Sequence, residues 1–118
     1  LFSSGAHGGE PAVKPLFQAL HDSGVEIVIN GHDHDYERFA PQSPNGGLDS
    51  AKGVREFVVG TGGRVMRPMD AVHQPNSEAA NDTTFGVLDL KLNPAGYDWE
   101  FVPVAGAGYT DSGTSSCH

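Results

Sequence analysis

Cysteine and basic side chains are both scarce in this chain of 118 residues. Because Cys117 is the one cysteine, an internal disulfide is excluded, and we interpret Cys117 as a tail residue without a catalytic role. The 7 lysines and arginines stand against 15 aspartates and glutamates, for a formal net charge of -8. This acidic balance argues against nucleic acid and against an anionic membrane surface as partners.

Apolar residues are also few. They make up 37% of the sequence, beside 16 glycines and 8 prolines, and this composition indicates a loop-rich chain. No run of about 18 apolar residues occurs, so we expect no insertion into a membrane.

Hydrophobic spacing predicts one main helix and about four or five strands, which makes the fold class α/β. Residues 11–23 carry apolar side chains at helical spacing, and Gly24 suits the position just past the end of a helix. Residues 64–83 have no regular pattern and are interpreted as a binding loop or lid. Strands are predicted for residues 25–30, 56–60, 84–92 and 97–104.

The last two predicted strands alternate apolar and polar residues on either side of a turn at residues 93–96. This pattern predicts a hairpin in which Tyr97, Trp99 and Phe101 face the apolar set of the preceding strand. From Ala105 onward, the glycine, serine and threonine content predicts a flexible tail over residues 105–118.

The segment 26–38 carries the most chemical information. Its apolar start predicts a buried strand, and the strand breaks at Asn30 and Gly31. His32 and His34 follow immediately, at the strand end where open α/β sheets bind ligands. Neutral imidazoles are common metal ligands, so we predict a metal site here. The alternative is a polar turn with two solvated histidines.

The same residues resemble a known family. Residues 31–34, Gly-His-Asp-His, resemble the Gly-His-x-His motif of calcineurin-like metallophosphoesterases. The longer string 31–38 is similar to the Gly-His-x-His-x-Tyr-Glu-Arg version of the purple acid phosphatase branch. Residues 1–8 and 56–63 are similar to the loop before this motif and to the strand and glycine turn after it.

This resemblance implies part of a four-layer αββα sandwich. Residues 1–104 would form the carboxyl-terminal half of the catalytic domain, and the parent enzyme would hydrolyse phosphate monoesters or diesters. Two metal ions, of iron, zinc, manganese or magnesium, would serve as cofactors. His32 and His34 would each complete the ligand set of one ion, and His7 would bind the phosphate or protonate the leaving group.

The family's earlier aspartate, asparagine and histidine motifs do not occur in this chain. We therefore expect that an amino-terminal partner part is missing and that the isolated chain is inactive. We predict that the residues just after the motif orient the metal-binding histidines without binding the metal themselves; they are Asp35, Tyr36, Glu37 and Arg38. In the run Gly60-Thr61-Gly62-Gly63, Gly62 is a candidate for binding the substrate phosphate through its backbone N–H.

Two other classes of function stay open at this point. The chain could be a metal-binding module without catalysis, or a structural half-domain that pairs with its missing amino-terminal partner. An exposed sheet edge would also allow a homo-oligomer. Members of the branch are often exported, so the resemblance favours a secreted or extracytoplasmic location.

Overall fold

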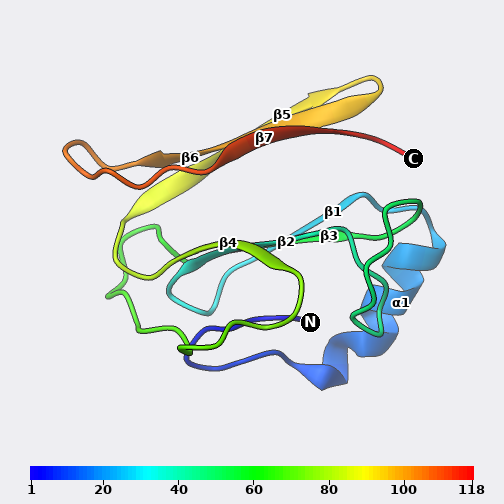
Figure 1. The fold of residues 1–118 in the computed structure, drawn as a ribbon, viewed down its shortest axis with the longest axis horizontal. Helices are drawn as coiled ribbons and strands as arrows, with labels where there is room; N and C mark the ends of the chain where they lie inside the picture. The colour runs from blue at the N-terminus through cyan, green and yellow to red at the C-terminus, as the bar shows by residue number, and fades with distance from the viewer.

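The computed structural model describes residues 1–118 and stacks two β-sheets, with one helix beneath the larger sheet (Figure 1). The amino-terminal segment runs across the same face of the larger sheet as the helix (Figure 1). These layers agree with the predicted α/β class and with part of an αββα arrangement. The elements are η1 (Pro11–Val13), α1 (Lys14–Asp22), β1 (Ile27–Asn30), β2 (Tyr36–Phe39), β3 (Arg55–Val59), β4 (Ser77–Asn81), β5 (Gly86–Asn93), β6 (Gly96–Pro103) and β7 (Ser112–Ser116).

The larger sheet has the strand order β1-β3-β2-β4. β1 and β3 are parallel, with Ile29 opposite Phe57, whereas β2 runs antiparallel to both β3 and β4. Because β1 pairs with β3 alone, it forms one edge of the sheet, and Ile29 on this edge is 51% exposed. The helix delivers the chain to β1 through Gly24, whose φ of 71° suits a residue just after a helix.

The smaller sheet has the order β5-β6-β7 and contains the predicted hairpin. Asn93 pairs with Gly96 at its turn, and the facing side chains are those expected from the alternation. Leu88 lies opposite Phe101, and Leu90 lies opposite Trp99. The hairpin prediction is therefore confirmed in both its position and its register.

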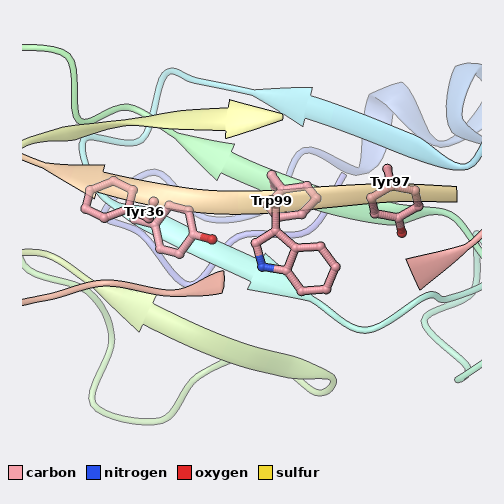
Figure 2. Close-up of a cluster of buried hydrophobic side chains, with 5 residues drawn as sticks. Tyr36, Tyr97 and Trp99 are labelled. Atoms are coloured by element: carbon pink, nitrogen blue, oxygen red, sulfur yellow. The ribbon is translucent and has the colours of Figure 1, made fainter. Parts of the chain in front are cut away.

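The core lies between the two sheets and is mostly aromatic (Figure 2). Tyr36 and Phe57 from the larger sheet meet Trp99 and Phe101 from the smaller one, with ring centroids 4.6 Å apart for Tyr36 and Phe101 and 5.9 Å apart for Phe57 and Trp99. Burying one such side chain contributes about 1.5–3 kcal/mol. The guanidinium groups of Arg38 and Arg55, both from the larger sheet, also lie over Trp99, about 5 Å from the centre of its ring.

The prediction of a flexible tail is wrong for residues 112–116, which form β7. Two contacts explain why this polar segment is ordered. Its backbone pairs with β6, and the preceding Asp111 accepts hydrogen bonds from Tyr36 and Trp99 of the core. Gly113 lies so close to Trp99 that a methyl group at this position would overlap the indole ring. The glycine therefore permits the packing of β7 against β6.

The strand count of four or five is also corrected, because the structure has seven strands. β2 combines Glu37 and Arg38 with two aromatic residues, so it lacks a simple apolar pattern. β4 lies in the segment 64–83, which the sequence indicated to be irregular throughout. Both strands carry polar side chains whose partners are far away in the sequence.

Candidate functional site

Three loops meet beyond the carboxyl end of β1. They are the amino-terminal residues 1–8, the turn 31–35 between β1 and β2, and residues 60–67 after β3. Gly60 shows how closely they approach: its N–H donates to Asp35 O over 2.9 Å, and a methyl group at Gly60 would overlap the carbonyl oxygen of Asp33. Glycine is therefore required at this crossing of two loops.

His32 and His7 lie together on the exposed side of this junction. Their ring centroids are 4.5 Å apart. His32 has a φ of 80°, a left-handed conformation that is uncommon for residues other than glycine. The turn after β1 therefore places the first histidine of the motif against the candidate catalytic histidine.

His34 is held by the loop that follows β3. Its Nδ1 lies 2.7 Å from the carbonyl oxygen of Val65. Because a carbonyl oxygen only accepts, Nδ1 carries the proton and donates. The lone pair of the neutral ring is then on Nε2. This arrangement, with one ring nitrogen fixed by a carbonyl, is typical of metal-ligating histidines.

Arg67 lies in the same loop and was not singled out by the sequence. Its Nη1 is 2.6 Å from His7 Nε2, and its backbone N–H donates to His34 O over 3.2 Å. The contact with His7 joins residues that are 60 positions apart in the sequence, so it could not be predicted from local residue spacing.

Acidic side chains beneath the turn hold the amino-terminal loop in place. Asp33 accepts from the backbone N–H of His7 over 2.8 Å and from the hydroxyl of Ser3. Glu37 accepts from both the backbone and the hydroxyl of Ser4, each over 2.7 Å. The position of His7 thus depends on a carboxylate between the two motif histidines.

Asp35 differs from these carboxylates because it is fully buried and its oxygens have no hydrogen-bond partner. Burial, with the nearby carboxylates of Asp33 and Glu37, raises the pKa of Asp35 to about 7. The backbone of Gly5 lies directly against its carboxyl group. The ionised form of Asp35 is therefore costly in this arrangement.

The residues predicted to support the histidines bond elsewhere in this structure. Tyr36 and Arg38 point toward the smaller sheet and donate to Asp111. Glu37 points the opposite way, to the amino-terminal loop, and Asp35 has no partner. The observed partner of the His34 ring is a backbone carbonyl that sequence reasoning missed.

Gly62 lies on an apolar groove formed with β5 and β6. The groove is lined by Phe85, Val87, Val102 and Val104, and by no histidine. A separate small cavity of about 180 Å³ lies beside His32. The groove beside Gly62 and the cavity beside His32 share no lining residue.

No three histidine, cysteine, aspartate or glutamate side chains of the chain gather into a metal-binding group. None of the helices has the length and hydrophobicity for a membrane crossing.

No protein-family model and no curated protein sequence matches the chain. Two solved structures resemble it. One is the purple acid phosphatase PPD1 from yellow lupin (Lupinus luteus) seeds, with a TM-score of 0.77 and 23% identity over 98% of this chain. The other is GAP50, described as the anchor in the inner membrane complex of Plasmodium, with a TM-score of 0.74 and 19% identity over 98% of this chain.

The chain spans 23% of the length of the lupin phosphatase and 33% of the length of GAP50. At these identities the likeness concerns the fold. We conclude that the chain has a mixed α/β fold similar to that of part of the lupin purple acid phosphatase.

Proposed function

We propose that this chain forms part of a two-metal site that hydrolyses phosphate monoesters or diesters. In this site His32 and His34 bind the metal ions, and His7 contacts the substrate. The observation that carries the proposal is the His34 ring, whose Nδ1 is fixed by Val65 O so that Nε2 is free to bind a metal. The motif lies at the end of β1, and the fold resembles that of a purple acid phosphatase, which supports the same interpretation.

The donor set fits zinc and iron among the proposed metals, although this chain supplies only part of it. His32 and His34 offer imidazole nitrogens, which suit zinc and iron, whereas manganese and magnesium prefer oxygen ligands. Because no group of three ligands forms, the remaining ligands would come from residues outside this chain. When bound, the metal ions would polarise the phosphoryl group and activate water for attack.

The remaining residues position the substrate in this proposal. His7 lies against His32, with its backbone held by Asp33, so it is placed to contact a phosphate bound at the metals. The net charge of -8 would repel a phosphate ester, and two metal cations would reverse the charge locally.

A second candidate is a structural role without catalysis. Two observations favour it: no three-ligand metal group forms within the chain, and one of the two similar structures is an anchor protein. In this case the chain would serve as a half-domain that pairs with an amino-terminal partner.

Hydrolysis of p-nitrophenyl phosphate and of bis(p-nitrophenyl) phosphate tests the two candidates. The product of the whole reading frame is purified and assayed with added Zn²⁺, Mn²⁺ or Fe³⁺, beside H34A and the control H73A, which replaces an exposed histidine. We expect turnover that H34A lowers at least about 100-fold and H73A leaves unchanged. No turnover by the unaltered protein with any metal would favour the structural role.

A further inference from the structure

The further inference concerns Arg67, and it rests on the function proposed above. Arg67 brings a positive charge to the histidines through Nη1, which is 2.6 Å from His7 Nε2. A guanidinium group has donors but no acceptor, so His7 Nε2 accepts this hydrogen bond. The remaining guanidinium nitrogens of Arg67 have no hydrogen-bond partner within the protein.

Arg67 also forms no ion pair with any of the 15 acidic side chains of the chain. The arginines of the core are neutralised: Arg38 pairs with Asp111 and Glu78, and Arg55 pairs with Glu78. Arg67 is partly buried and forms no ion pair. Its planar group of N–H donors is therefore available to an anion at the mouth of the site.

The backbone around Arg67 is anchored on both sides. Before it, Val65 O accepts from the His34 ring over 2.7 Å. After it, Met69 N donates to Asp82 and Asp70 N donates to Ser4 O, each over 2.9 Å. These contacts fix the segment against the histidines, so little ordering is needed when an anion binds.

The chemistry of the two ester classes then decides which one Arg67 favours. A phosphate monoester has three non-bridging oxygens and two negative charges, whereas a diester has two such oxygens and one charge. A centre of two cations can engage two non-bridging oxygens. In a monoester a third charged oxygen is left over, and a diester has an ester group in its place.

We propose that Arg67 binds this third oxygen and makes phosphate monoesters the preferred substrate class. His7 stays beside it as the acceptor of Nη1, and the unused N–H groups of Arg67 face the phosphate. Charge-assisted hydrogen bonds of this kind are the strong class, and an arginine can form two of them to one phosphate.

The kinetic test compares R67A with R64A, which removes an exposed arginine from the same loop. The product of the whole reading frame is assayed on p-nitrophenyl phosphate and on bis(p-nitrophenyl) phosphate. We expect R67A to lower kcat/KM for the monoester about 10- to 100-fold and for the diester less than about threefold. R64A should change neither value by more than about threefold. An equal loss for both esters, or no loss, would overturn the proposal.

Calorimetric titration with inorganic phosphate separates this inference from the proposed function. For the metal-loaded protein, we expect R67A to raise the Kd for phosphate at least about tenfold and R64A to leave it unchanged. If the unaltered protein hydrolyses neither ester but R67A weakens phosphate binding, the hydrolase function fails and the role of Arg67 stands. If hydrolysis is observed and R67A binds phosphate normally, the role of Arg67 fails and the function stands.

Discussion

Replacing Asp111 with alanine should destabilise the protein by about 3 kcal/mol. Asp111 accepts from Tyr36 Oη over 2.6 Å, from Arg38 Nε over 2.7 Å and from Trp99 Nε1 over 3.2 Å. The side chains of Arg38 and Asp111 are only 11% and 12% exposed. The variant D111A would remove the acceptor of four donor atoms near the core, because Arg38 also donates to Asp111 through Nη2. Part of the loss is offset because Arg38 keeps its ion pair with Glu78.

Urea denaturation followed by the fluorescence of Trp99, the one tryptophan, measures this loss. The control D89A removes an exposed aspartate from β5 and should cost less than about 0.5 kcal/mol. A loss below about 1 kcal/mol for D111A would refute the idea that Asp111 fastens β7 to the core.

The pH dependence of the same comparison gives an independent check. Burial would raise the pKa of Asp111, but hydrogen bonds from Arg38 and Tyr36 outweigh it and hold the pKa below its usual value. Because the pKa of Asp111 is lower in the folded protein than in the unfolded chain, its ionised carboxylate stabilises the fold above the unfolded-state pKa of about 4. This stabilisation is lost as the pH falls through the folded-state pKa. The difference between D111A and the unaltered protein should therefore shrink below about pH 4.

Three further predictions concern single residues. Because the pKa of Asp35 is raised to about 7, ionisation of this carboxyl group opposes folding increasingly from about pH 4 to pH 7. In urea titrations without metal, D35N should therefore stabilise the protein at pH 8 by at most about 4 kcal/mol. At pH 4 the same substitution should change the stability little. G60A should lower the Tm by several degrees in calorimetry because its methyl group overlaps Asp33 O, whereas G62A meets no atom and should cost less than about 1 kcal/mol. Ile29 on the β1 edge is 51% exposed, so I29K should reduce self-association in sedimentation velocity; equal association of both proteins would exclude this edge as the contact.

The sequence predicted those elements whose signals are local. The spacing of Tyr97, Trp99 and Phe101 was sufficient for the hairpin and its register, because alternation on a half-buried strand determines which side chains face the core. The apolar start and the glycine break of the segment 26–38 likewise placed His32 and His34 just after β1. The prediction of a buried strand is wrong, because β1 is an edge strand with no buried residue. Its match to a family motif added the expected fold.

The missed elements depend on partners that are distant in the sequence. β2 contains the buried Glu37 and the half-buried Arg38, and these charges are satisfied by Ser4 from the amino-terminal loop and by Asp111 near the carboxyl end. β7 consists of small polar residues and has no apolar pattern. Arg67 reaches His7 across 60 positions. Propensity and periodicity describe neighbours along the chain, so they contain no information on such pairings.

The metal content of the whole gene product tests the central claim most directly. The protein is purified without chelators, and its metals are quantified by plasma mass spectrometry beside H32A, H34A and the control H73A. The proposed two-metal centre predicts about two metal ions per molecule, a loss of at least one in H32A and in H34A, and no change in H73A. Equal metal content in all four proteins, or none in the unaltered protein after incubation with Zn²⁺, Mn²⁺ or Fe³⁺, would contradict the assignment of His32 and His34 as metal ligands.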